Sequence, residues 1–495
     1  MTLRDRLFLQ EEIPDEALDA EEPPYYRPPA GSAVHEYLMA RRTMLAGSMP
    51  TRIVRPRPTA APDPAVFTDF LKGSGKQQAS TTMAFARMLR SLVRDSNIGR
   101  FVAPIVPDEA RTFGLEPLIA ETMIYAPYGQ RYTPVDADLI LRYAEDRKGQ
   151  VLEEGITEAG AMASFTALAT SYATFGRPML PIYLFYSMFG FQRIGDLAWA
   201  LGDMRGRGLL VGCTAGRTTL NGEGLQHEDG HSPVLAATNP ACRVYDASFA
   251  YEVAVITEEA VARTLGEHPE DKFWYLTLYN ENYVMPAIEG GPGSQAAAAV
   301  REGILRGIYR FAAPGGSDAV DARNGDARRA TLLFSGPMWQ AAVEARRVLA
   351  EDHGVATDAW AVTSYSELRN EALAVERWNR LHPDLEPRVP HVTGVLADAT
   401  GSAQAPVVAV SDYVRAVPDM VARWVGRPFT SLGTDGFGRS DTRAALRRFF
   451  EVDPGHIVVA VLAGLAAQGL AKADEVTRAI AAHGIDTEGA EPWAD

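Results

Sequence analysis

Four polar clusters in the sequence carry residue types that could do chemistry. They are PDEARTFG (107–114), EEGITEAGA (153–161), YSMFGFQRIGD (186–196) and GRTTLNGEGLQHEDGHS (216–232). The first cluster places Asp108 and Glu109 directly after an apolar run, at the end of a strand where parallel sheets open towards ligands. Asp108 could equally serve only as the N-cap of a helix.

Two glutamates in the second cluster, Glu154 and Glu158, lie four residues apart and would share one face of a helix. Like charges at that spacing repel each other unless one of them points into a site. Glu158 has the small or apolar neighbours Ile156, Ala159 and Gly160, which would let a ligand approach closely. The spacing by itself is equally typical of a solvated helix face.

Aromatic and imidazole side chains dominate the third and fourth clusters. Tyr186 and Phe189 lie at a turn between a strand and a helix, where aromatics usually pack in the core and sometimes stack on a planar ring. The fourth cluster is polar and Gly-rich, which predicts a loop, and it carries His227 and His231. Their i,i+4 spacing resembles a helical metal pair, but Gly230 opposes a helix and no third ligand is evident. We therefore expect no metal here, and instead a histidine for proton transfer or substrate contact.

Apolar runs that alternate with helical patterns must position these clusters. The expected strands lie at 100–109, 179–189, 208–215, 241–248 and 272–280, and further α/β units follow at ATLLFSG, AWAVTSYS, VVAVSD, FTSLGTDG and IVVAVLAGLAAQG. The expected helices lie at 80–95, 157–176, 191–208 and 257–268. Strands that alternate with helices predict an α/β fold with doubly wound, mostly parallel sheets.

Composition shifts divide the chain into four parts. Residues 1–60 are rich in proline, which predicts an extended N-terminal arm with one short helix at 35–48, the alternative being a disordered tail. We expect a first domain at 61–290, a polar and Gly-rich linker at 291–330, and a second, smaller domain at 331–495.

Charge and cysteine content exclude several classes of protein. The 495 residues have a net charge of −15, which argues against a nucleic-acid partner and against an anionic membrane surface. Two cysteines, Cys213 and Cys242, exclude a disulfide scaffold and favour a cytoplasmic location. No apolar run reaches the roughly 18 residues that a membrane span requires. A Walker P-loop, a GxGxxG after a strand and a GxSxG elbow are absent, so the sequence does not support phosphoryl transfer, nicotinamide chemistry or serine hydrolysis.

Several long motifs together resemble one enzyme family. TLYNENYVMPA (277–287), LGTDGFGRSD (432–441), YGQRYTP (128–134), ERWNRLHP (376–383) and PRVPHV (387–392) join the third, fourth and first clusters, in order along nearly the whole chain. This set is similar to the homodimeric-type pyruvate dehydrogenase decarboxylating component, which depends on thiamine diphosphate. The resemblance implies an aminopyrimidine-binding domain followed by a transketolase-like C-terminal domain.

The resemblance also implies a missing part. Enzymes of the family hold the diphosphate through Mg²⁺ and a Gly-Asp-Gly…Asn motif in a further N-terminal domain, and no Gly-Asp-Gly occurs in this sequence. We therefore expect a split enzyme in which this chain is a β-like subunit and an α-like partner carries the motif and the Mg²⁺ ligands. Two copies of each chain would form a heterotetramer. An engineered fragment of a longer enzyme is the alternative.

The family pattern assigns the cofactor contacts to particular residues. Gly155-Ile156-Thr157-Glu158 matches the segment whose glutamate bonds to N1′ of the aminopyrimidine and drives its change of tautomer, so Glu158 is the expected catalytic carboxyl. Ile156 belongs to the same cofactor-binding segment. Phe189 matches the aromatic that stacks on the aminopyrimidine, and Tyr186 matches a residue that lines the same pocket.

The remaining matches concern the substrate and the subunit junction. Asp108 and Glu109 match an acidic pair near the cofactor, and His227 matches a histidine that contacts the substrate-derived intermediate. His231 either contacts the substrate or orders the loop.

The reaction implied is decarboxylation of a 2-oxo acid, most simply pyruvate, with transfer of the two-carbon unit to a lipoyl group. One alternative is a split transketolase-like enzyme that moves a two-carbon unit from a ketose phosphate to a lipoyl or acyl-carrier protein in natural-product biosynthesis. Another is an inactive scaffolding paralogue.

Overall fold

The computed structural model describes residues 3–22, 24–45, 47, 56–107, 110, 112–133, 144–311, 328–397 and 405–494. It divides into two units, Met1–Arg55 with Ala173–Gly176, and Pro56–Tyr172 with Arg177–Asp495. The smaller unit contains the helices α1 (Leu3–Arg6), α2 (Asp15–Leu18) and α3 (Ala33–Met44). Helix α3 begins after Ser32, whose hydroxyl accepts a hydrogen bond from the His35 N–H, and it overlaps the short helix expected in the arm.

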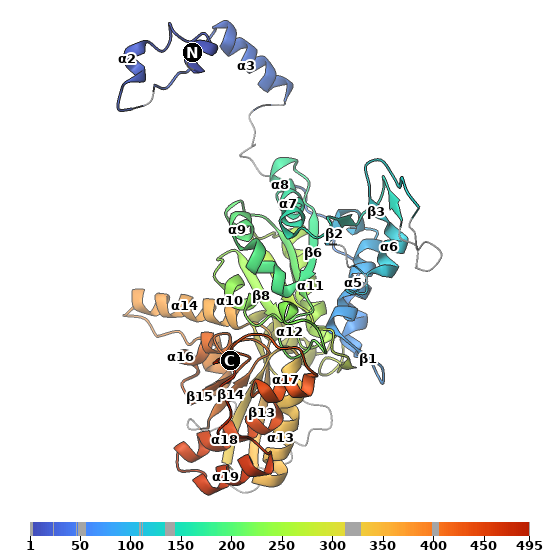
Figure 1. Ribbon diagram of the computed structural model, residues 1–495, viewed down its shortest axis with the longest axis vertical. Helices are drawn as coiled ribbons and strands as arrows, with labels where there is room; N and C mark the ends of the chain where they lie inside the picture. Colours follow the sequence, from blue (N-terminus) through green and yellow to red (C-terminus); the bar gives the residue numbers. More distant parts are fainter. Residues whose placement is uncertain are drawn as a thin grey trace. The chain divides into compact units, whose positions relative to one another are not determined.

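A parallel six-stranded sheet forms the first half of the larger unit (Figure 1). Its order is β5-β2-β6-β7-β9-β8, and the strands are β2 (Val102–Val106), β5 (Leu152–Glu153), β6 (Leu180–Tyr186), β7 (Gly208–Cys213), β8 (Cys242–Asp246) and β9 (Phe273–Thr277). Every neighbouring pair is parallel, so the carboxyl ends of the strands meet at one edge. Each apolar run expected to form a strand before residue 290 does so.

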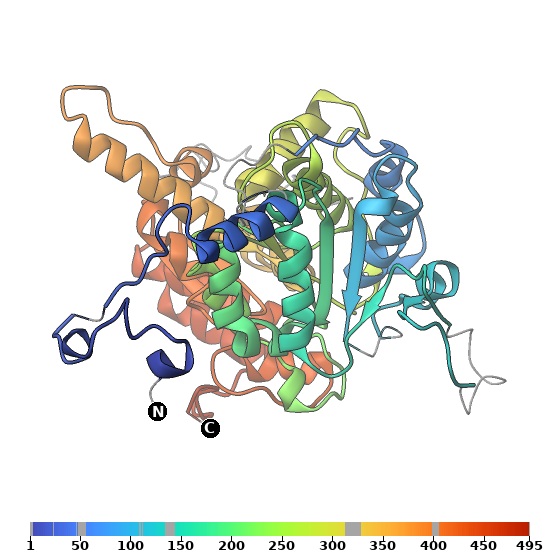
Figure 2. The ribbon, with the colours of Figure 1, turned by 90° about the horizontal axis from the view of Figure 1, so that it is seen from above.

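Helices cover both faces of this sheet (Figures 1 and 2). One face packs against α5 (Thr81–Arg94) and α11 (Ala250–Leu265), and the other against α7 (Glu158–Ala169) and α9 (Gly190–Asp203). The alternation of side chains along β6 produces this arrangement. Leu184 packs into the core on the α5 and α11 side, whereas Phe185 packs on the α7 and α9 side. The expected doubly wound α/β fold is confirmed.

The second sheet has the order β11-β13-β12-β14-β15, with β11 antiparallel and the other strands parallel. Its strands are β11 (Ile308–Arg310), β12 (Arg328–Phe334), β13 (Val355–Val362), β14 (Val407–Val410) and β15 (Phe429–Leu432). Leu332 faces α13 (Trp339–His353) and α18 (Pro454–Ala467), and Leu333 faces α14 (Tyr365–Leu381). The segment 291–330, expected as a linker, contributes α12 (Gln295–Arg306) and β11, while residues 312–327 lie outside the described residues.

Shorter elements connect these layers. They are α4 (Ala65–Thr68), η1 (Asp69–Lys72), β1 (Gln78–Ala79), η2 (Gly99–Phe101), α6 (Glu116–Thr122), β3 (Ile124–Tyr125), β4 (Glu145–Asp146), α8 (Ser171–Thr174), η3 (Ser187–Phe189), η4 (Leu225–His227), α10 (Ser232–Ala237), β10 (Tyr283–Val284), η5 (Gly336–Met338), α15 (His391–Ala397), η6 (Pro418–Val421), α16 (Ala422–Val425), α17 (Arg443–Phe449) and α19 (Ala473–Ala482). Strands β1 and β10 pair antiparallel, and β3 and β4 pair parallel.

One apolar stretch differs from the sequence expectation. Residues 443–467 have the length and composition of a membrane span, although no such run was expected. In the structure this stretch is divided between α17 and α18. Helix α18 packs against α13 and buries Val458, Val461 and Leu462 completely, as the core helix of a globular domain does.

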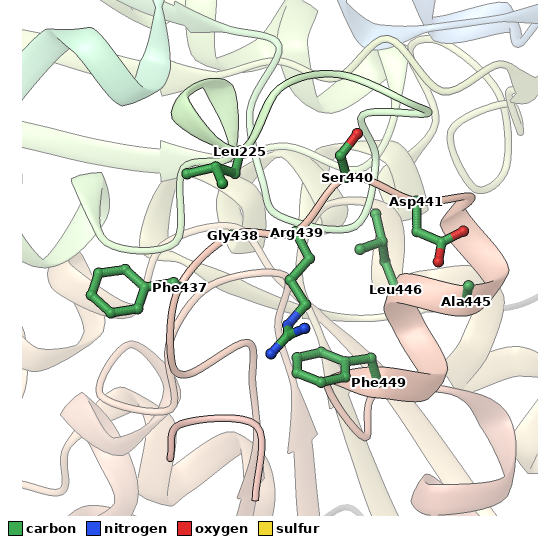
Figure 3. A pocket seen from close by; sticks show the side chains of 9 residues that line it. All are labelled: Leu225, Phe437, Gly438, Arg439, Ser440, Asp441, Ala445, Leu446 and Phe449. Atoms are coloured by element: carbon green, nitrogen blue, oxygen red, sulfur yellow. The ribbon is translucent and has the colours of Figure 1, made fainter. Parts of the chain in front are cut away.

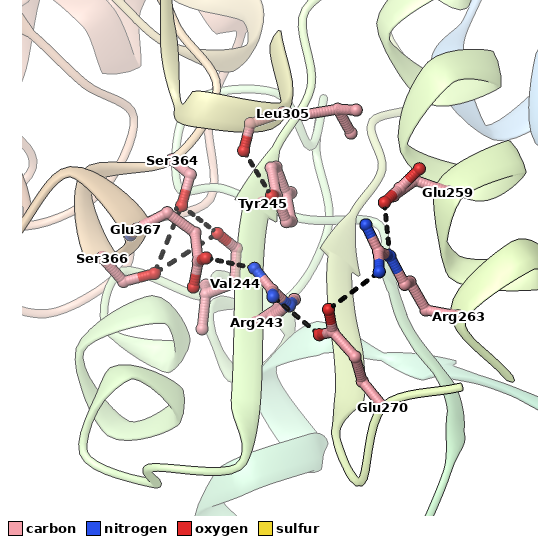
Figure 4. Close-up of polar contacts among 10 residues, drawn as sticks. All are labelled: Arg243, Val244, Tyr245, Glu259, Arg263, Glu270, Leu305, Ser364, Ser366 and Glu367. Carbon is pink, nitrogen blue, oxygen red and sulfur yellow. Dashed lines mark hydrogen bonds and ion pairs between the residues drawn. The ribbon is translucent and has the colours of Figure 1, made fainter. Parts of the chain in front are cut away.

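The two sheets are joined through the edge strand β8 (Figure 4). Arg243 on β8 pairs with Glu367 on α14 at 2.5 Å and with Glu270 at 2.7 Å. Next to this pair, the Ser364 hydroxyl donates a hydrogen bond to the Val244 carbonyl at 2.5 Å. The arginine side chain is 22% exposed, so this ion pair is partly withdrawn from solvent.

Replacement of this arginine should weaken the junction. We expect Arg243→Gln to lower the free energy of unfolding by about 1–3 kcal/mol, because it leaves a partly buried Glu367 carboxylate without its partner. Arg347→Gln is the matched control, because Arg347 pairs with exposed Glu344 and Glu351 and should be replaced without a measurable change. Urea denaturation of both variants measures the difference, and equal stability of the two would contradict the importance of the β8–α14 junction.

Candidate functional site

Three aromatic rings from distant parts of the chain meet at the carboxyl end of β6. Tyr186 is the last residue of that strand, and Phe189 closes the turn η3 that leads into α9. His227, at the end of η4, stacks on Tyr186 with ring centroids 5.1 Å apart and meets Phe189 edge-on at 5.4 Å. The parallel topology explains this meeting, because chain segments that leave neighbouring strands emerge at the same edge. All three side chains are partly exposed, so the cluster is accessible to a ligand.

The carboxyl group of Glu158 lies beside this cluster. Helix α7 begins at Glu158, and the hydroxyl of the N-cap Thr157 accepts a hydrogen bond from the Gly160 N–H at 3.2 Å. Glu158 Oε1 accepts a hydrogen bond from Arg193 Nη1 at 2.7 Å. The side chain of Glu158 is 14% exposed, and no bond to its Oε2 is recorded among the residues that the structure describes.

Arg193 is a site residue that the sequence analysis missed. Its guanidinium lies 4.2 Å from the centroid of the Phe189 ring while it binds Glu158. Arg193 therefore links the carboxyl group to the aromatic cluster. The signal was available in the sequence, because Arg193 follows Phe189 by four residues and the two share one side of the turn that opens α9.

The two glutamates of the second cluster do not share a helix face, contrary to expectation. Gly155 adopts φ +73°, which is not a helical conformation, and α7 begins only at Glu158. Glu154 therefore lies outside the helix. Glu154 instead accepts a hydrogen bond from the Ser164 hydroxyl at 2.5 Å. Ile156 is 79% exposed, so it is not buried against the cluster.

Asp108 and Glu109, the expected acidic pair, lie outside the described residues.

The two histidines of the fourth cluster have different partners. His227 Nδ1 lies 3.2 Å from Glu223 Oε2, and His231 Nε2 lies 2.9 Å from Gln192 Oε1 on α9. His231 thereby fastens the loop to the helix that carries Arg193. Within the described ranges, no group of three or more His, Cys, Asp or Glu side chains is placed to hold a metal ion.

Much of the histidine-bearing loop, residues 216–232, is buried despite its polarity. Its buried polar side chains are Arg217, Thr218, Thr219, Glu228, Asp229 and Ser232. Arg217 Nη1 donates to the carbonyl of Thr434, and Asp229 accepts hydrogen bonds from the N–H groups of His231 and Ser232 at 3.0 and 2.9 Å. A Cβ at position 230 would overlap the Arg217 guanidinium, which explains the glycine between Asp229 and His231.

The arrangement suits a planar nitrogen heterocycle. Phe189 and Tyr186 are half-buried aromatic side chains of the kind that can stack on such a ring. Glu158 Oε2 can bind a ring nitrogen while Oε1 remains on Arg193. His227 can transfer a proton or contact a group attached to the same ligand.

Two family models match this chain, one over the region of the first sheet and one over most of the region of the second. Residues 60–286 match the model described as the pyruvate dehydrogenase E1 component middle domain. Residues 316–453 match the model described as the transketolase-like TK C-terminal domain.

The chain is also similar to curated pyruvate dehydrogenase E1 components. It is 48% identical to that of Pseudomonas aeruginosa over 482 residues, which are 97% of this chain and 52% of the relative. It is 44% identical to that of Escherichia coli K12 over 493 residues, covering 99% of this chain and 52% of the relative. The chain thus spans about half the length of the curated relatives it matches.

Solved structures share the fold. A transketolase from Leishmania mexicana superposes with a TM-score of 0.56 at 16% identity, covering 82% of this chain and 48% of the other. A transketolase mutant from Pichia stipitis gives a TM-score of 0.55 at 14% identity, covering 82% and 49%. The chain therefore has a transketolase-like fold.

The packing of Gly230 on Arg217 can be tested directly. We expect Gly230→Ala to lower the free energy of unfolding by about 1–3 kcal/mol, because the added methyl must displace a buried, hydrogen-bonded guanidinium. Gly195→Ala is the matched control, since Gly195 lies in α9 with open space at its Cβ position and alanine favours a helix. Thermal unfolding checks both variants, and a Gly230→Ala protein as stable as the control would contradict the observed packing.

Proposed function

We propose that this chain, which matches the middle and C-terminal regions of pyruvate dehydrogenase E1 components, forms the aminopyrimidine half of a thiamine diphosphate-dependent enzyme that decarboxylates a 2-oxo acid, pyruvate being the simplest. One observation carries the proposal. The Glu158 carboxyl, the Phe189 ring and the His227 imidazole meet at the carboxyl edge of one parallel sheet. A scaffolding protein has no need of that combination.

The described residues fit one half of the cofactor. Glu158 has an oxygen available for a ring nitrogen, and the aromatic cluster beside it is partly exposed. Among the described residues, no group of three or more His, Cys, Asp or Glu side chains is placed to hold a metal ion. The fit therefore supports an aminopyrimidine site.

The residues of this chain would have the following roles in cofactor binding and catalysis. Bound thiamine diphosphate supplies a carbon nucleophile and stores the electrons released on decarboxylation. Glu158 would hold the ring nitrogen N1′ and move a proton to or from it, while Arg193 fixes the orientation of the carboxyl group. Phe189 and Tyr186 bind the ring by stacking and exclude water from it. His227 contacts the reacting end of the donor and moves a proton there.

We further propose that an α-like subunit with a Gly-Asp-Gly…Asn motif completes the site and supplies the Mg²⁺ ligands. The support is that this sequence contains no Gly-Asp-Gly. Two copies of each chain would form a heterotetramer with two sites. The two-carbon unit would then pass to the lipoyl group of a further partner.

A coupled assay tests the proposed activity. The chain is co-expressed with its Gly-Asp-Gly partner, and ferricyanide reduction is followed with pyruvate in the presence of thiamine diphosphate and Mg²⁺. We expect activity with pyruvate that falls about 10²–10⁴-fold in Glu158→Ala, the usual contribution of a positioned proton-transfer group. Glu154→Gln is the matched control and should keep the activity, because Glu154 bonds to Ser164 rather than to the cluster.

Other outcomes of this assay have distinct meanings. Activity with a ketose phosphate and none with pyruvate would show that the donor is a ketose phosphate, and it would leave the assigned site residues unchanged. A stable complex with no activity towards either donor would favour the scaffolding alternative. Equal activity of the Glu158 and Glu154 variants would refute the assigned role of Glu158.

The role of Arg193 gives a separate prediction. We expect Arg193→Leu to weaken thiamine diphosphate binding to the assembled enzyme about tenfold or more, since a charge-assisted hydrogen bond that orients Glu158 is lost together with the contact to Phe189. Arg193→Lys keeps the charge and should lose less affinity. Quenching of tryptophan fluorescence by the cofactor measures both, and unchanged affinity in Arg193→Leu would show that Arg193 does not position the site.

A further inference from the structure

The motif LGTDGFGRSD (432–441) has no role in the site described above, yet it lies against the histidine-bearing loop. Three hydrogen bonds fasten the first part of that loop to the C-terminal region. The Thr218 N–H donates to Asp412 Oδ1 at 3.0 Å, the Gly222 N–H to the Asp441 carbonyl at 3.1 Å, and Arg443 Nε to the Thr219 carbonyl at 2.7 Å. The last part is fastened by the Val414 N–H, which donates to the Gly230 carbonyl at 2.8 Å.

Between these two ends, the turn that carries His227 is anchored through Glu228. Glu228 Oε2 accepts a hydrogen bond from the Arg439 N–H at 2.6 Å, and Glu228 is 1% exposed. A Cβ at Gly438 would lie 2.8 Å from the Glu228 Cβ, so the glycine lets the C-terminal segment approach this closely. The sequence Gly438-Arg439 is thus shaped to receive this one side chain.

Apolar packing contributes little beside this anchor. A hollow of about 490 Å³ lies between the loop and the segment 437–449 (Figure 3). Leu225 lines it from the loop, and Phe437 and Phe449 line it from the opposite side. Leu225 is 57% exposed and Phe437 is 78% exposed, so these side chains leave space between them. On the side that faces segment 437–449, the position of the His227 turn therefore depends on its hydrogen bonds, whereas the His227 ring packs on Tyr186 and Phe189 on the other.

We propose that Glu228 is a positioning residue for His227, and that its bond to Arg439 locks the histidine turn onto the C-terminal domain. The backbone transmits the effect over one residue, because the Glu228 N–H donates to the Leu225 carbonyl and the His227 N–H to the Gly224 carbonyl within η4. A fixed Glu228 therefore fixes the His227 ring against Tyr186. The catalytic role of His227, and with it the positioning role of Glu228, rests on the proposed function.

The lock should depend on pH. The charged groups around Glu228 are Arg217 on the same loop and Asp412 at the end of β14, and Glu228 Oε1 is buried with no partner among the described residues. Burial raises the pKa of Glu228 from 4.5 to about 7. Because this pKa in the closed loop exceeds the ordinary value, the closed loop binds the proton more tightly, and ionisation opposes closure. The loop should be held most firmly below about pH 4.5, loosen as the pH rises towards 7, and change little above that value.

Hydrogen–deuterium exchange of the full chain tests the proposal without cofactor or substrate. Amides of residues 220–231 are compared at pH 6 and pH 8 after correction for intrinsic exchange rates. We expect the natural chain to exchange about tenfold faster at pH 8 than at pH 6, because each pH unit between the two pKa values changes loop closure by at most about tenfold and the change ends near pH 7. Glu228→Gln remains neutral and still accepts from Arg439, so exchange should be slow at both values. Glu228→Ala should exchange fast at both.

Two further variants, Gly438→Ala and Asp412→Asn, show whether the pH dependence comes from Glu228. Gly438→Ala forces the segment away from Glu228 and should therefore give the same fast exchange as Glu228→Ala. It replaces Glu228→Ala in the test if the Glu228→Ala protein does not fold. Burial also raises the pKa of Asp412 to about 7, so Asp412→Asn is examined in parallel and should retain the pH dependence of residues 220–231. Loss of the pH dependence in Asp412→Asn and its survival in Glu228→Gln would overturn the assignment, as would unchanged exchange in both Glu228→Ala and Gly438→Ala.

The pH dependence of kcat in the assembled enzyme is a further measurement, and it would not change if Glu228 had a purely structural role. Glu228→Gln should keep kcat at pH 6 and show a flatter fall towards pH 8, whereas Glu228→Ala should lower kcat with unchanged affinity for thiamine diphosphate. A Glu228→Gln enzyme with the natural pH profile would contradict the positioning role. An assembled natural enzyme that is inactive with every donor refutes the proposed function, whereas the exchange result stands by itself.

Discussion

The fold of this chain depends on the burial of one polar loop between two sheets. Residues 216–232 are hydrophilic, yet Arg217, Thr218 and Glu228 are almost completely buried. A buried polar group costs free energy unless it is hydrogen-bonded, so each must find a partner. The partners come from the C-terminal region, through Asp412, the Thr434 carbonyl and the Arg439 N–H. The second sheet is therefore required to satisfy a loop that belongs to the first.

Parallel topology then places the chemistry. The carboxyl ends of β5 and β6 point towards the same edge, so the start of α7 and the turn before α9 lie close together. Glu158 and Arg193 meet there, 35 residues apart in the sequence. The loop contributes His227 to this edge only because it is fastened on both sides, by His231 to α9 and by Glu228 to the C-terminal region.

The fold was largely predictable from the sequence, and the contacts of the site were only partly so. Short apolar runs such as LPIYLFY in the first sheet form strands, because a strand of a parallel sheet is buried on both faces. Strand β5 escaped prediction because two residues give no periodic signal. Glu154 and Glu158 do not share a helix face, because Gly155 has φ +73° and α7 begins only at Glu158. The contact of Glu228 with Arg439 joins positions 211 residues apart, so no local pattern could predict it.

The central claim is that Glu158, Phe189 and His227 form one half of a thiamine diphosphate site. A crystal structure of the chain assembled with its diphosphate-binding partner and the cofactor tests this most directly. The account predicts the aminopyrimidine stacked on Phe189, with N1′ within hydrogen-bonding distance of the Glu158 carboxyl and His227 facing the thiazolium side. An aminopyrimidine bound away from Glu158, or a complex in which these residues contact protein alone, would contradict it.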